Sequence, residues 1–127
     1  MKIKNIYVKP VLEFLDTLNL SGLSSIGRTK LKEKLMEHNY ELVKDQNTII
    51  DEYEGWIDKE KGEFTTQNPE LLSAINQLFN EEVEIAYDSP FKQDFVQALK
   101  EDKTKWSGVD ADAYALLYEE LIEATEE

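Results

Sequence analysis

The chain has 127 residues, 27 of them acidic and 14 basic, and its formal net charge at pH 7 is −13. An apolar content of 41% is enough for the core of one domain. Cysteine is absent, which excludes a disulfide framework, a thiol nucleophile and a thiolate metal site. With one histidine, a zinc site would need mostly carboxylate ligands, whereas zinc prefers nitrogen and sulfur. We therefore expect a single domain over residues 1–127 with no metal and no cofactor.

Charge is distributed unevenly along the chain. Residues 1–34 carry a net charge of +4, and residues 35–127 carry −17. A surface this acidic repels nucleic-acid phosphates and anionic lipid headgroups, so we predict no direct nucleic-acid binding and no membrane binding. The basic stretch 28–34 has no aromatic side chain for base stacking and indicates a solvated helix face. Without a membrane span or a secretory signal in residues 1–8, an intracellular location is expected.

The first two predicted elements are helices. Pro10 suits a first helical turn, and a helix is predicted over residues 8–18, ending near Ser21-Gly22. Ser24 or Ser25 would then cap a long helix over about residues 24–54. The apolar positions of the first helix are Val11, Leu12, Leu15 and Leu18.

The long helix carries apolar pairs that recur every seven residues. These pairs are Leu35/Met36, Leu42/Val43 and Ile49/Ile50. Such a seam is typical of a coiled coil and needs a partner helix to bury it. The partner could come from this chain or from a second copy, which would make a homo-oligomer. An intramolecular helix hairpin is the simpler interpretation.

After Gly55 the spacing of the apolar residues changes to one that is typical of β-strands. Residues 56–66 predict two short strands around a polar turn. Because an isolated hairpin is only marginally stable, we expect Trp56 and Phe64 to pack on the helices or on a third strand. Residues 82–87 alternate between polar and apolar and are predicted to be that third strand.

The rest of the chain is predicted to be helical. Asn68-Pro69 and Ser89-Pro90 are helix-start signals, and each precedes apolar residues at helical spacing. The last helix has an apolar stripe made of Tyr114, Leu117, Tyr118, Leu121 and Ile122. The predicted fold class is therefore mainly α (α+β): a helical bundle with one long helix (24–54) and a small antiparallel β element (56–66 and 82–87).

Catalytic motifs are not found. His38 is the only imidazole, and no serine sits in a strand-to-helix nucleophile elbow beside which it could act. It is expected to be a surface or seam-edge residue. Asp110 and Asp112 resemble the start of an EF-hand loop, but Leu121 occupies the position of the closing glutamate. Walker and dinucleotide-binding loops are absent as well. We predict no enzymatic activity and no catalytic residue.

Two sets of residues near the C-terminus are candidates for binding a partner protein. Most aromatic side chains are expected to complete the core, but tryptophan and tyrosine are also enriched in binding hot spots. Trp106 is the better interface candidate, because it lies in an otherwise polar connection. The candidate partner-binding residues are Trp106, Tyr114, Tyr118, Glu119, Glu120 and Glu123.

The order of short motifs resembles a family of small phage and prophage proteins from Gram-positive bacteria, known as domain of unknown function number 1617. The matching segments are residues 1–5, 20–31, 52–53, 81–85, 106–108 and 111–114. Gly27 departs from the expected helix-favouring stretch and leaves open where the long helix begins. The resemblance implies a phage setting, in the cytoplasm of a bacterial host or within the virion, and it brings no known activity.

Two functions agree with these observations. The first is a structural or assembly accessory, associated with the tail or virion, that acts by binding other phage proteins. Its basic residues 1–34 could also meet an acidic face of another copy. The alternative is a host-directed inhibitor of a defence nuclease, of the anti-restriction or anti-CRISPR type, whose carboxylates on the helix 110–127 imitate nucleic-acid phosphates.

Overall fold

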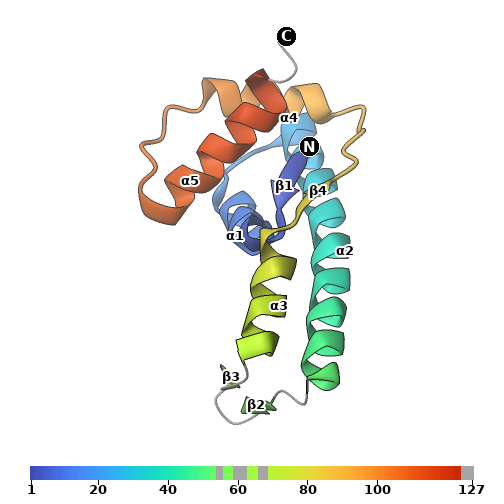
Figure 1. Cartoon of the computed structure of the whole chain (residues 1–127). Coiled ribbons are helices and arrows are strands. Elements are labelled where there is room, and N and C mark those ends of the chain that lie inside the picture. The colour runs from blue at the N-terminus through green and yellow to red at the C-terminus, as the bar shows by residue number, and fades with distance from the viewer. Residues whose placement is uncertain (54–55, 59–62, 66–68, 124–127) are drawn as a thin grey trace.

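The computed structural model describes residues 1–53, 56–58, 63–65 and 69–123 (Figure 1). Over these residues the chain forms five α-helices and two separate two-stranded antiparallel sheets. The predicted class, mainly α with one long helix and a small antiparallel β element, is confirmed. In chain order the elements are β1 (Lys2–Lys4), the 3-10 turn η1 (Asn5–Tyr7), α1 (Val8–Thr17), α2 (Gly22–Glu52), β2 (Trp56–Asp58), β3 (Glu63–Thr65), α3 (Pro69–Asn80), β4 (Glu82–Glu84), α4 (Lys92–Glu101), α5 (Gly108–Leu117) and the π-helical segment η2 (Tyr118–Glu123).

The long helix α2 begins two residues earlier than predicted. Gly22 has a φ of 64°, a conformation that glycine adopts at little cost, and it joins the extended residue Ser21 to the helix. The predicted cap at Ser24 or Ser25 is therefore wrong. The hydroxyl of Ser24 lies inside the first turn, where it donates to the carbonyl oxygen of Ser21 at 2.8 Å.

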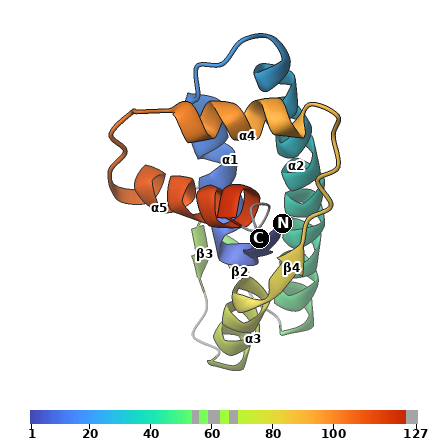
Figure 2. The same cartoon turned by 90° about the horizontal axis from the view of Figure 1, so that it is seen from above.

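The helices enclose one hydrophobic core. α1 packs on α2 and α5, and α4 crosses the first half of α2 (Figure 2). Helical periodicity explains this packing, because each helix turns one apolar stripe toward the others. The large, fully buried side chains of the core are Ile3, Phe14, Leu15, Leu31, Leu35, Phe95, Leu117, Leu121 and Ile122.

The heptad seam of α2 is divided between the core and the surface. One member of each apolar pair is buried within the chain, namely Leu35, Leu42 and Ile50. The predicted intramolecular partner is confirmed for these residues, because α2 packs on α1, α3 and α4. Met36 and Val43 instead remain exposed.

The strand 82–87 does not join the predicted hairpin, so that pairing was wrong. β4 pairs antiparallel with β1, and the register sets Lys2 opposite Glu84 and Lys4 opposite Glu82. Opposite charges directly across a pair of strands stabilise it, and Ile3 between the two lysines enters the core. β2 and β3 form their own sheet. The expected packing of Trp56 and Phe64 lies outside the side chains that the structure describes.

Gly27 lies inside α2, at its closest approach to α4. A Cβ atom added to Gly27 would lie 2.3 Å from the carbonyl oxygen of Phe91 and 2.8 Å from Cβ of Phe95. These distances are far inside van der Waals contact. The glycine that departs from the helix-favouring pattern is therefore required by helix packing.

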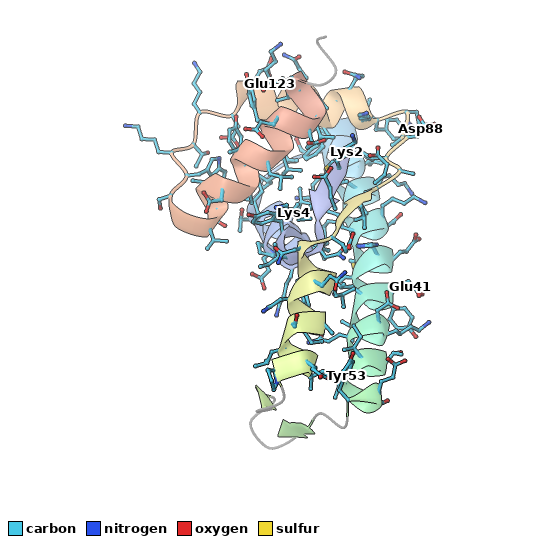
Figure 3. All side chains as sticks on the ribbon, in the orientation of Figure 1. Lys2, Lys4, Glu41, Tyr53, Asp88 and Glu123 are labelled. Atoms are coloured by element: carbon cyan, nitrogen blue, oxygen red, sulfur yellow. The ribbon has the colours of Figure 1, made fainter. Side chains whose placement is uncertain are left out.

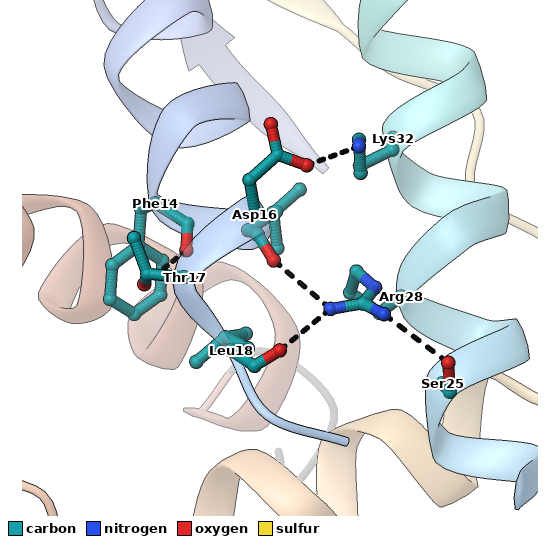
Figure 4. A network of polar contacts seen from close by, with 8 residues as sticks. Phe14, Asp16, Thr17, Leu18, Ser25, Arg28 and Lys32 are labelled. Atoms are coloured by element: carbon teal, nitrogen blue, oxygen red, sulfur yellow. Dashed lines mark hydrogen bonds and ion pairs between the residues drawn. The ribbon is translucent and has the colours of Figure 1, made fainter. Parts of the chain in front are cut away.

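Part of the basic stretch 28–34 joins α1 to α2 (Figure 4). Nη1 of Arg28 donates to the carbonyl oxygens of Leu15 (3.2 Å) and Leu18 (2.9 Å) at the end of α1, where the carbonyl oxygen of Leu15 also accepts from the N–H of Leu18 at 3.4 Å. Lys32 forms an ion pair with Asp16. The interpretation of the whole stretch as a solvated face is thus wrong at Arg28, because it is half-buried and caps a helix.

Candidate protein-binding groove

A groove with a volume of about 600 Å³ lies between η1–α1 and α5. Three of its side chains are large, apolar and exposed: Ile6 (50% exposed), Tyr7 (44%) and Val109 (62%). Its other lining residues are Pro10, Val11, Asp112, Ala113, Ala115, Leu116 and Glu119. We call this feature the α5 groove.

Local structure explains the wall that α5 contributes. Gly108 has a φ of 59° and begins the helix, which places Val109 in its first turn. Val109, Asp112 and Leu116 then follow at spacings of three and four, so they share one helix face. Ala113 lies on the same face and has little side chain, which keeps the groove open between the two walls.

The charge of the α5 groove is negative. Asp112 and Glu119 contribute carboxylates, and none of the ten residues that line the groove is basic. An apolar surface with carboxylates beside it suits an apolar segment that carries lysine or arginine. Apart from the ring of Tyr7, the other side chains that line the groove are aliphatic.

A second groove, of about 550 Å³, continues this surface toward α2. It shares Ile6 and Pro10 with the α5 groove. Its further lining residues are Asn5, Lys9, Asn39, Leu42, Val43, Gln46 and Phe79. η1 and the start of α1 therefore form a ridge with an apolar hollow on each side.

The predicted aromatic residues lie together, but at the edge of the core. The ring of Phe14 meets Trp106 edge-on at 4.9 Å between centroids, and Tyr114 at 6.3 Å. Tyr118 lies beyond, 6.0 Å from the ring of Tyr114. The hydroxyl of Tyr114 donates to the carbonyl oxygen of Leu99 at 3.0 Å. None of the three predicted aromatics lines the α5 groove.

Burial raises the pKa of the Tyr114 phenol, and the nearby negative charges of Asp102 and of the ionised Tyr118 hydroxyl add to the increase. The phenol therefore stays protonated and keeps its role as a donor to Leu99. Nε1 of Trp106 is buried and has no hydrogen-bond partner among the residues that the structure describes. The hydroxyl of Tyr114 thus joins α5 to α4, while the ring of Trp106 packs on Phe14 of α1.

The predicted carboxylates are not equivalent. Glu119 is exposed and lines the α5 groove. Glu120 is half-buried, and its Oε2 accepts a hydrogen bond of 3.1 Å from the backbone N–H of Lys2. Glu123 is exposed at the end of η2, on the same side of the molecule as Lys2 (Figure 3). The change from α-helix to π-helix at Tyr118 alters the spacing on which a regular row of carboxylates would depend.

His38 has a structural partner that sequence reasoning missed. Its Nε2 lies 2.7 Å from Oδ1 of Asn5, whose Nδ2 donates to the carbonyl oxygen of Leu78 at 2.8 Å. Because a carbonyl oxygen can only accept, this bond fixes the orientation of the amide, and Nε2 of His38 is the donor. The histidine thus joins α2 to η1 and α3.

The residues that form the α5 groove were also missed. Ile6 and Tyr7 precede the first helical pattern, and nothing in their sequence indicates that they would be exposed. Val109 could have been found from the spacing of Val109, Asp112 and Leu116 behind a Ser-Gly helix start. Ile6 and Val109 are about 100 residues apart, and tertiary packing brings them to opposite walls of the groove.

Comparisons with known proteins bring no relative. No family model matches the chain, and neither a curated protein nor a solved structure matches it significantly. Among the described residues, His, Asp and Glu side chains do not gather in a group of three or more suited to a metal ion. Within the same residues, each helix is too short or too polar to cross a membrane.

Proposed function

We propose that this protein has no enzymatic activity and acts by binding another protein in the α5 groove. The observation that carries this proposal is the gathering of three exposed apolar side chains, Ile6, Tyr7 and Val109, around one hollow. Exposed apolar side chains that gather around a concave surface are typical of interaction sites. Their burial on a partner would contribute about 25 cal/mol for each Å² removed from water.

The chemistry of the groove defines the segment that it would accept. An apolar stretch would cover Ile6 and Val109, while a lysine or arginine beside it would meet Asp112 and Glu119. A basic amphipathic helix has both properties. The strongly negative net charge of the chain would attract such a segment before contact is made.

The biological setting that we propose is that of a phage or prophage accessory protein. It would act in the cytoplasm of a bacterial host or as a tail- or virion-associated component. The resemblance of the short sequence motifs to small phage proteins supports this setting. The groove supports the mode of action, because an assembly accessory works by docking to other proteins.

The nuclease inhibitor is the second candidate, and exposed carboxylates favour it. Glu119 and Glu123 project from η2 and could meet the basic cleft of a nuclease. Glu120 would contribute less, because the backbone of Lys2 already occupies its Oε2. The two functions share Glu119 but differ in Val109 and Glu123, so substitutions at Val109 and Glu123 can separate them.

The test is a pull-down of the tagged 127-residue chain from phage-producing cells. Val109→Glu disables the groove, and Leu72→Glu is the matched control because Leu72 is an exposed apolar residue of α3 outside both grooves. The proposal expects a virion or assembly protein that binds the wild type and Leu72→Glu but not Val109→Glu. A nuclease that binds all three and is lost from Glu119→Gln/Glu123→Gln would establish the inhibitor instead.

A further inference from the structure

The outer face of α2 carries a second apolar feature, separate from the α5 groove. Met36 (56% exposed), Tyr40 (64%) and Val43 (45%) follow at spacings of four and three and form one stripe along the helix. α2 lies along the right-hand side of the molecule in two perpendicular views, and the segment between β4 and α4 passes outside its first half (Figures 1 and 2). Glu41, from the same stretch of helix, points away from the rest of the chain (Figure 3). We call these three residues the α2 stripe.

Charged residues accompany the α2 stripe at a fixed interval. Lys30, Glu37, Lys44 and Asp51 are spaced by seven residues, alternate in sign and are all exposed. A spacing of seven places them along one side of the helix, next to the positions of Met36 and Val43. This alternating row is the pattern that determines which helix can lie alongside α2 and in which direction.

We propose that two copies of this chain pair through α2, antiparallel and related by a twofold axis near Tyr40. Such an arrangement sets Met36 opposite Val43 of the partner subunit. The flanking row then sets Lys30 opposite Asp51 of the partner subunit, and Glu37 opposite Lys44 of the partner subunit. Twofold symmetry repeats each contact, so one register satisfies the apolar stripe and all four charged positions.

The reverse orientation lacks this complementarity. In a parallel pair the charged row lies on opposite sides of the seam in the two helices, so its positive and negative members do not meet one another. The larger charge pattern of α2 agrees with the antiparallel direction. Its first half, to Met36, holds four basic residues and one acidic residue, and the rest holds one basic and five acidic residues.

The charged side chains are free to change partners. Within the chain they form exposed ion pairs, Lys30–Glu33 at 3.7 Å, Lys34–Glu37 at 4.0 Å and Lys44–Glu41 at 3.4 Å. Exposed pairs of this kind contribute little to stability, so exchanging them costs little. This inference does not rest on the proposed partner groove, because no residue of α2 lines the α5 groove.

The first experiment measures mass by sedimentation equilibrium over a range of concentrations. The wild type should approach twice 14.7 kDa, and Tyr40→Asp should remain at 14.7 kDa.

Lys30→Glu replaces two attractive contacts by two repulsive ones, so the dimer Kd should rise about tenfold. Asp51→Lys added to Lys30→Glu exchanges the charges and should return the Kd to within about threefold of the wild type. The matched control Lys34→Glu alters the same charge one turn along, off the stripe, and should leave the Kd within about threefold of the wild type.

The second experiment uses the absence of cysteine from the chain, which makes each introduced thiol unique. Under mild oxidation, a mixture of Glu37→Cys and Lys44→Cys chains should form the mixed disulfide dimer. Each variant alone should form little, because the antiparallel register separates like positions by about 10 Å along the helix.

Three results would overturn the proposal. These are a wild type that stays at 14.7 kDa at millimolar concentration, a charge exchange that does not restore the Kd, and disulfides that form between two copies of the same single variant. Circular dichroism of Tyr40→Asp serves as the check on folding. If that variant unfolds, the charge exchange and the disulfide pattern still decide the question, because they change exposed side chains alone.

Discussion

The hydroxyl of Tyr87 donates a hydrogen bond of 2.6 Å to the carbonyl oxygen of Gly27. The two residues are 60 positions apart, and the bond joins the segment before α4 to the interior of α2. Both residues are buried. This contact lies where α2 and α4 approach most closely, so it reports directly on the packing of these two helices.

Removing the hydroxyl of Tyr87 should weaken the fold moderately. Tyr87→Phe keeps the buried ring and loses one buried hydrogen bond, so the free energy of unfolding should fall by about 1 kcal/mol. Urea denaturation followed by circular dichroism measures the change. Tyr40→Phe, a change at an exposed tyrosine, is the control and should leave the unfolding midpoint unchanged.

The same tyrosine predicts a dependence on alkaline pH. Burial raises the pKa of the Tyr87 phenol well above its ordinary value. An unfolded tyrosine ionises near pH 10 while the folded one stays neutral, so the contribution to stability is complete below about pH 10 and declines above it. Wild-type stability should therefore fall between about pH 10 and 11.5, and Tyr87→Phe should show a smaller slope. Equal slopes for the two proteins would contradict this assignment.

A methyl group at Gly27 should destabilise the fold, because its steric cost exceeds the gain in helix propensity. In Gly27→Ala the new Cβ meets the carbonyl oxygen of Phe91, a backbone atom that can move only if α4 moves with it. Overpacking of this kind costs about 1–3 kcal/mol. Thermal unfolding measures the loss, and Thr29→Ala, at an exposed position of the same helix, should cause none.

Arg28 should contribute more to stability than its basic neighbours. Its guanidinium satisfies the carbonyl oxygens of Leu15 and Leu18 and also donates to Oγ of Ser25 at 3.2 Å. Arg28→Met keeps the stem and removes these charge-assisted bonds, so we expect a loss of about 2 kcal/mol. Lys34→Met removes an exposed charge and should change the free energy of unfolding by less than about 0.5 kcal/mol. Equal losses in the two variants would rule out the capping role.

Asn5 should tolerate no change in its amide group. Asn5→Asp keeps the shape of the side chain but sets a carboxylate oxygen against the carbonyl oxygen of Leu78, where Nδ2 now donates. Two acceptors facing each other in a half-buried site should cost about 2 kcal/mol at pH 8. Chemical denaturation at pH 8 measures this loss.

Most of the helices could be predicted from local patterns. The first helix was placed to within one residue at its end, because Val11, Leu15 and Leu18 mark a single buried stripe. The proline start signals located α3, whose first residue is Pro69, and α4, which begins at Lys92, two residues after Pro90. The positions of such helices depend on interactions between residues that are close in the sequence, so they can be predicted from the sequence.

The contacts between distant segments could not be predicted in this way. The pairing of Lys2 with Glu84 depends on two short strands whose signals are weak on their own. The role of Gly27 appears only when Phe91 lies against it. Likewise, nothing near Val109 indicates that Ile6 will face it across a groove. These features arise from tertiary packing, which the periodicity of apolar residues does not predict.

The pairing of β1 with β4 has a consequence for synthesis on the ribosome. β1 leaves the ribosome early, but its partner, residues 82–84, follows only after α1, α2 and α3 have been made. Until then Ile3 has no strand beside it and only part of the core in which to bury itself. Contacts that close such long loops form late in folding, so a nascent chain that stops before β4 should be open to proteases at its first residues.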